Sequence, residues 1–153
     1  MKKFRKEGVI VMLLTDAKKV LIQQLNSIPE LKEISDNGQS ISFFKNNLNI
    51  KITLLKEDCI DSYNSKKMPK GPFPRFQEKT FYYEQKIEYA GYVESDQGCI
   101  DILFWENNWY TVESTEKPGK CFFKSIYPDL IPYDVPGAKY INKKSLTDYI
   151  AQL

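Results

Sequence analysis

The chain has 153 residues, of which 42% are hydrophobic and 27% are charged, and its formal net charge is +2 at pH 7. This composition excludes a disordered protein, and the length favours a single domain over residues 1–153 with a buried core. Histidine is absent, which excludes Ser-His-Asp and Cys-His nucleophiles, His-ligated metals and imidazole proton shuttles. The glycines form no phosphate-binding loop. We therefore expect a protein that is not an enzyme and carries no cofactor.

Residues 1–14 combine basic residues with an apolar run, as a signal peptide does. However, Glu7 interrupts the basic region, the run at 9–14 is short, and no small-x-small cleavage site follows it. No apolar stretch approaches the roughly 20 residues needed to span a bilayer. We therefore expect no membrane contact.

The cysteines are three in number and widely spaced, at Cys59, Cys99 and Cys121. An odd count without a Cys-x-x-Cys motif argues against a disulfide framework and favours reduced, buried thiols. This pattern predicts a cytoplasmic protein.

Residues 9–14 are short enough to form a buried strand, and the stretch 17–28 that follows has the apolar stripe of a helix. Thr15 or Asp16 is expected to cap this helix, and Pro29 to end it. A competing interpretation is one helix from residue 9 through 28. The stripe consists of Ala17, Leu21, Leu25 and Ile28.

Residues 31–34 are expected to add a helical turn before the chain reversal at 36–38. Two strands are predicted at 40–45 and 50–56, because apolar and polar residues alternate in the second of them. Together with the loop at 46–49 they form a hairpin.

The segment 59–79 is predicted to be a loop, since it contains three prolines that cannot complete a strand ladder. Lysines and arginine alternate there with Phe73 and Phe76, which suits a loop that binds single-stranded nucleic acid through residues 66–79. The alternative is an exposed connection whose phenylalanines fold back onto the sheet.

Residues 80–114 have the pattern of a three-stranded antiparallel meander. The expected strands are 80–94, 99–105 and 109–114, joined by turns at 95–98 and 107–108. One face of the first two strands is apolar, and the other face carries Leu103 and Trp105. That second face is covered by a helix or serves as a docking surface. The expected cross-strand pairs are Val93–Ile100, Gly91–Ile102, Tyr89–Phe104, Leu103–Val112 and Trp105–Tyr110.

The C-terminal part is predicted to contain a short strand at 121–126 and a short terminal helix that begins after Ser145 with a capping-box pattern. The whole pattern predicts an α+β fold: a mostly antiparallel sheet, made of a meander and a hairpin, with an N-terminal and a C-terminal helix packed on it.

Charge is segregated along the chain. Residues 80–116 contain eight acids and one base, Lys86, a local net of −7, so that the remaining residues sum to +9 in a chain of +2. A field of one sign attracts a partner of the opposite sign. We therefore expect a non-enzymatic domain that docks a basic partner protein, as small bacterial inhibitors and immunity-type proteins do with cationic toxin domains. The expected partner-binding residues are Glu84, Glu88, Asp101, Trp105, Glu106, Trp109 and Tyr110.

A magnesium-dependent nuclease is a further alternative. An aspartate followed by an acid-x-lysine pair on a strand can hold Mg²⁺ and orient a water molecule, and Asp61, Glu84 and Lys86 match this pattern. The segment 30–32 matches the acid-x-lysine part equally well. The pattern is therefore of low specificity.

Overall fold

The computed structural model describes residues 3–6, 9–56, 80–81, 88–114, 121, 123–124 and 141–153. The basic loop 66–79 lies outside these ranges, as do Asp61, Glu84 and Lys86. The predictions that concern them remain predictions.

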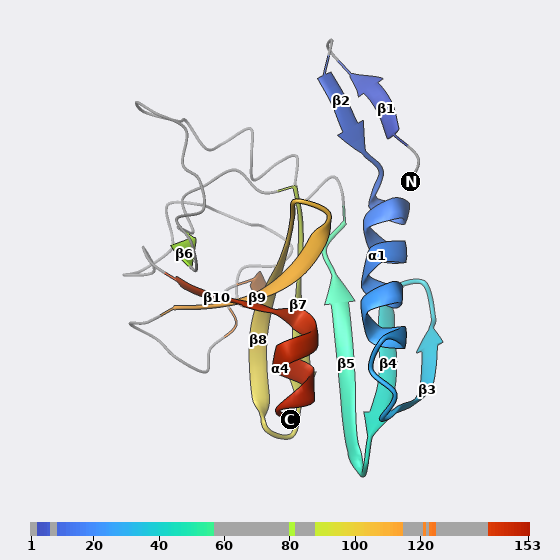
Figure 1. Ribbon diagram of the computed structural model, residues 1–153, viewed down its shortest axis with the longest axis vertical. Helices are drawn as coiled ribbons and strands as arrows, with labels where there is room; N and C mark the ends of the chain where they lie inside the picture. Colours follow the sequence, from blue (N-terminus) through green and yellow to red (C-terminus); the bar gives the residue numbers. More distant parts are fainter. Residues whose placement is uncertain are drawn as a thin grey trace.

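The described part of the chain is an α+β fold in which two helices pack on an eight-stranded antiparallel sheet (Figure 1). The helices are α1 (Leu14–Asn26) and α4 (Leu146–Ala151). A separate hairpin, β1 (Lys3–Lys6) and β2 (Val9–Met12), extends beyond the N-terminal end of α1. The strands of the large sheet, in spatial order, are β3 (Leu31–Asp36), β4 (Ser40–Lys45), β5 (Leu48–Leu54), β7 (Tyr89–Ser95), β8 (Gly98–Trp105), β9 (Asn108–Ser114), β10 (Ile141–Ser145) and β6 (Thr80–Phe81).

Both helices lie on the same face of the sheet, in front of it in Figure 1. We call this the inner face and the opposite one the outer face. Alternation along each strand assigns the side chains to the two faces. The inner face forms the core with the helices, and its buried members include Ile52, Val93, Ile102, Phe104 and Trp109. The outer face of the meander carries Tyr92, Glu94, Cys99, Asp101, Leu103, Trp105, Tyr110 and Val112.

The register of the first hairpin of the meander is the predicted one, with Val93 opposite Ile100, Gly91 opposite Ile102 and Tyr89 opposite Phe104. The start of the expected first strand differs from the prediction. Thr80 and Phe81 pair with β10 at the far edge of the sheet.

The second hairpin of the meander is shifted by two residues from the prediction. Its turn is Glu106-Asn107, and both residues have positive φ, 46° and 66°, the geometry of a type I′ turn. Leu103 therefore lies opposite Tyr110, and Trp105 opposite Asn108. A shift of two leaves every side chain on its expected face, whereas a shift of one would exchange the faces.

The N-terminal half corrects two expectations and supports a third. The strand predicted at 9–14 is present as β2, so the alternative of one helix from residue 9 to 28 is wrong. The helix has Leu13 as its N-cap and no side-chain cap, so neither Thr15 nor Asp16 caps it. Residues 31–34 belong to strand β3, and their predicted helical turn is wrong, because pairing with β4 outweighs a weak local preference.

Two cysteines also depart from the sequence-based expectation, since Cys99 and Cys121 form a disulfide with their Cα atoms 5.5 Å apart. The prediction of reduced thiols is wrong for this pair, because spacing along the chain does not reveal which residues meet in space. The expected cytoplasmic location loses its main support, since disulfides are rare in cytosolic proteins. Phe123 and Lys124 are helical, which corrects the strand predicted at 121–126. None of the helices in the described ranges has the length and apolar character needed to cross a bilayer.

Candidate functional site

The seven residues expected to bind a partner do not share one surface. Glu84 lies outside the described residues. Asp101 and Trp109 are fully buried, each with 0% of its surface exposed. The other four lie at one end of the meander: Trp105, Glu106 and Tyr110 at or near the β8–β9 turn, and Glu88 directly before β7.

Trp109 belongs to the core, so its expected role in a partner surface is wrong. Its Nε1–H donates to the carbonyl oxygen of Ala17 at 2.8 Å, and its ring lies 5.3 Å from that of Phe104. The Gln24 side chain clamps its backbone, with Oε1 accepting from the Trp109 N–H at 2.8 Å and Nε2 donating to the Trp109 carbonyl. Alternation along β9 already separates Trp109 from Tyr110, and this signal could have excluded it.

Asp101 is on the outer face as expected, but it is covered, so its role as an exposed acid is wrong too. Its Oδ1 accepts a hydrogen bond from the backbone N–H of Phe123 at 2.8 Å. Phe123 is itself buried. Cys121 and Phe123 therefore lie over this part of the outer face.

The four remaining residues form what we call the turn surface: Glu88, Trp105, Glu106 and Tyr110. The rings of Trp105 and Tyr110 are 6.1 Å apart and tilted by 59°, a favourable edge-to-face arrangement. Both rings are partly exposed, and both carboxylates are exposed. If the β7–β8 register is continued by one residue, Glu88 lies opposite Trp105. The turn surface thus brings two rings and two acids to the same end of the sheet.

The three strands that carry this surface contain charges of one sign, whereas the neighbouring strand β10 carries Lys143 and Lys144. Residues 88–114 contain six acids and neither lysine nor arginine. The acids are nevertheless divided between the two ends of the strands, because Asp96 lies in the β7–β8 turn and Glu106 in the β8–β9 turn. Glu94 pairs with Lys124. The end that carries Glu106 combines exposed acids with the adjacent rings of Trp105 and Tyr110.

A cleft that the sequence analysis did not predict lies between the start of α1, the β3–β4 turn and the end of β5. Its volume is about 410 Å³. The lining residues combine two lysines and three polar side chains with apolar groups. They are Leu14, Thr15, Lys18, Gly38, Gln39, Thr53, Leu54, Leu55 and Lys56.

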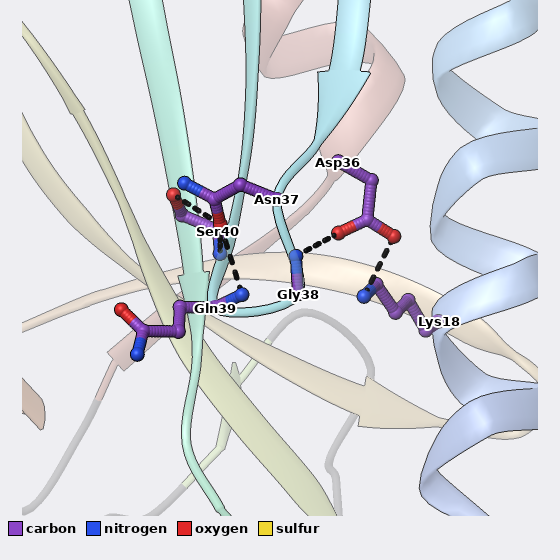
Figure 2. Close-up of polar contacts among 6 residues, drawn as sticks. All are labelled: Lys18, Asp36, Asn37, Gly38, Gln39 and Ser40. Atoms are coloured by element: carbon purple, nitrogen blue, oxygen red, sulfur yellow. Dashed lines mark hydrogen bonds and ion pairs between the residues drawn. The ribbon is translucent and has the colours of Figure 1, made fainter.

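The polar contacts beside this cleft hold the β3–β4 turn against α1 (Figure 2). Lys18 Nζ lies 2.7 Å from Asp36 Oδ2, while Asp36 Oδ1 accepts from the Gly38 N–H at 2.8 Å. Asn37 Oδ1 accepts from the backbone N–H of Gln39 and of Ser40. The hydrogen bond from Lys18, with a further one from Gly38, lowers the pKa of Asp36 below its ordinary value of 3.8. Asp36-Asn37-Gly38 is the reversal that the sequence predicted, and its contacts serve the turn itself.

Among the described residues, no cluster of three or more acids or cysteines is arranged to hold a metal ion. One buried acid is nevertheless unusual. Asp16, in the first turn of α1, is fully buried, and neither carboxylate oxygen has a hydrogen-bond partner. Lys19 Nζ lies 4.0 Å from its Oδ1.

Comparison with known proteins finds no matching protein-family model, no matching curated protein and no matching solved structure.

Proposed function

We propose that the protein is a non-enzymatic binding domain that docks a basic protein partner through the turn surface. One observation supports this proposal: the rings of Trp105 and Tyr110 lie at the same end of the sheet as Glu88 and Glu106. The strands that carry these residues, 88–114, contain neither lysine nor arginine. Aromatic side chains at the centre of an interface supply most of its binding energy, and surrounding charges select the partner.

The proposed partner is cationic, like the toxin domains that inhibitors and immunity-type proteins neutralise. Exposed acids on the turn surface attract such a partner over a distance of about 8 Å at physiological salt. The two tilted rings give the contact an apolar centre. Docking is therefore expected to weaken with salt but not to vanish.

Two matched charge reversals test this proposal. Glu106→Lys and Asp96→Lys each change one exposed turn acid into a base, but only Glu106 lies beside the two rings. The immobilised wild-type chain, both variants and Trp105→Ala are incubated with a lysate of the source cells, and retained proteins are quantified by mass spectrometry. We expect a cationic protein that wild type and Asp96→Lys retain equally and that the other two variants retain at least ten-fold less.

Poly-L-lysine serves as a probe for charge alone. If Glu106→Lys and Asp96→Lys reduce retention of every protein and of poly-L-lysine to the same extent, the attraction is unspecific and the proposed docking site is wrong. Equal retention by wild type and Trp105→Ala would likewise contradict it.

The nucleic-acid alternative concerns the loop 66–79, and the nuclease alternative concerns Asp61, Glu84 and Lys86. No observation on the described residues favours either. Retention on heparin that falls steeply with the logarithm of salt concentration would support the nucleic-acid alternative. Heat released at millimolar Mg²⁺ by the wild type but not by Glu84→Ala would support the nuclease.

A further inference from the structure

Among the described residues, Cys121, Phe123 and Lys124 each contact the outer face of the β7–β8 hairpin. Cys121 is bonded to Cys99, and the Phe123 N–H donates to Asp101. Lys124 forms an ion pair with Glu94. Cys99 and Asp101 are two residues apart on the same face of β8, and Glu94 lies opposite Cys99 on β7. The described residues of the segment, 121 and 123–124, thus lie on the outer face around Cys99, Asp101 and Glu94.

The hydrogen bond and the ion pair differ in strength. Lys124 and Glu94 keep 52% and 28% of their side-chain surface exposed, and ion pairs in water contribute little. The bond from Phe123 to Asp101 is buried and involves a charge, so it is stronger, but it forms only when the segment is in place. The covalent bond keeps the segment close enough for the other two contacts to re-form at once.

The two sulfurs are also unequally accessible. Cys121 is buried, with 8% of its surface exposed, whereas Cys99 is half-buried at the beginning of β8. Thiol–disulfide exchange depends on access to the sulfur that is attacked. Cys99 is therefore the sulfur that an external thiolate reaches first.

We propose that the Cys99–Cys121 disulfide is a redox-sensitive clamp that a dithiol opens and that holds residues 121–124 on the outer face. A dithiol thiolate attacks Cys99 Sγ, and Cys121 leaves as a thiolate that takes up a proton. The second thiol of the reductant then attacks the mixed disulfide and frees Cys99. The disulfide thus gains two electrons and two protons from the dithiol, which becomes a cyclic disulfide.

Opening the clamp has a structural consequence on the outer face. Without the covalent bond, Phe123 leaves the β8 strand more often, and the buried carboxylate of Asp101 loses its N–H donor from Phe123. The inner face does not depend on this contact, because its core is formed with α1 and α4. Reduction is therefore a local opening and not a global unfolding. This inference is independent of the docking function.

Hydrogen exchange with mass spectrometry tests the clamp in the full chain carrying Cys59→Ser, which leaves only this pair of cysteines. Thiol titration should find no free thiol in the oxidised form and two after dithiothreitol. We expect peptides containing residues 121–124 to exchange at least ten-fold faster after reduction, while peptides from β4 and β5 keep their rates. Oxidised glutathione should restore the slow exchange.

Two controls keep the test decisive. Cys59→Ser with Cys121→Ser should exchange rapidly at 121–124 without dithiothreitol and should not respond to it. If the double variant does not fold, the reduction experiment on Cys59→Ser alone still decides. Two free thiols in the oxidised form, or equal exchange at 121–124 in both forms, would overturn the proposal. Faster exchange across the whole chain would overturn it as well, since the disulfide would then be a structural staple.

Discussion

The indole Nε1–H of Trp109 donates to the carbonyl oxygen of Ala17 at 2.8 Å and joins β9 to the first turns of α1. Gln24, two turns further along the same helix, binds the Trp109 backbone through both ends of its side-chain amide. A single residue of the sheet thus positions the helix along most of its length. Trp109 is the largest side chain that the described core buries completely.

Trp109→Ala should therefore destabilise the fold strongly, whereas Trp105→Ala should not. A buried tryptophan replaced by alanine costs roughly 3–5 kcal/mol, and the Ala17 carbonyl loses a partner in addition. Trp105 is partly exposed on the other face, so we expect a cost of less than half as much. Urea denaturation of the two variants measures the difference. Equal losses would show that Trp105 is also a core residue and would remove it from the turn surface.

Lys45→Met should weaken the attachment of α4. Lys45 is buried on the inner face, and its Nζ donates to the carbonyl oxygens of Ala151 and Leu153, each at 2.7 Å. These are C-terminal carbonyls that no residue within the helix can satisfy. Losing the charged donor should cost roughly 1–3 kcal/mol in the free energy of unfolding.

Lys51→Met is the matched control for this substitution, because Lys51 is an exposed lysine on the neighbouring strand β5. It should change the stability by less than about 0.5 kcal/mol. Faster hydrogen exchange in α4 is expected for Lys45→Met alone. If both variants unfold at the same urea concentration, Lys45 does not hold the helix.

Asp36 should make stability depend on pH in the acidic range. The hydrogen bond from Lys18 lowers its pKa in the folded state below the ordinary 3.8, so the unfolded chain binds more protons there. The stabilisation is fully present above the unfolded pKa and is lost as the pH falls through the lower folded pKa. The stability difference between wild type and Asp36→Asn should thus be larger at pH 7 than at pH 2.5.

Urea denaturation at several pH values checks this, and Lys18→Met provides the partner control. Removing the lysine should reduce the pH-dependent part of the difference, because the largest cause of the shift is lost. Parallel pH profiles for wild type and Asp36→Asn between pH 7 and pH 2.5 would contradict the assignment.

Gly91→Ala should disturb the pairing of β5 with β7. A Cβ atom at this position would lie 2.3 Å from the carbonyl oxygen of Thr53, a backbone atom that cannot rotate away. We expect a loss of roughly 1–3 kcal/mol, as for other overpacked sites. Gly38→Ala is the control, because alanine there introduces backbone strain but no steric clash. Gly38 has open space around it but a φ of 93°, so alanine there should cost about 1 kcal/mol. The prediction fails if Gly91→Ala is the milder of the two in thermal unfolding.

Asp16→Ala should raise stability, which is unusual for a buried position. The carboxylate is fully buried and neither oxygen is hydrogen-bonded, so its removal eliminates a desolvation cost that exceeds its attraction to the helix N-terminus. We expect a gain of about 1 kcal/mol. Asp148→Ala, which removes an exposed acid from the first turn of α4, should instead lose a few tenths of a kcal/mol. A large loss for Asp16→Ala would show that this carboxylate has a structural partner.

The sequence by itself determined the fold class, the helices and most of the strands. It also determined the register of β7 with β8, since a four-residue turn and strict alternation allow only one arrangement that buries an apolar face. Part of the candidate surface followed from the same pattern, because alternation places Trp105 and Tyr110 on one face. These features depend on neighbours along the chain or on a single hairpin, and local periodicity contains that information.

The tertiary structure alone decided the rest. Glu106, a residue without a preference for positive φ, forms the β8–β9 turn because this register sets Trp109 opposite Phe104 and under α1. Asp101 is buried because Phe123 lies against it and donates its backbone N–H to the carboxylate. Cys99 is oxidised because the fold places Cys121 beside it. Each of these outcomes depends on contacts between distant parts of the chain, whose energy no local pattern records.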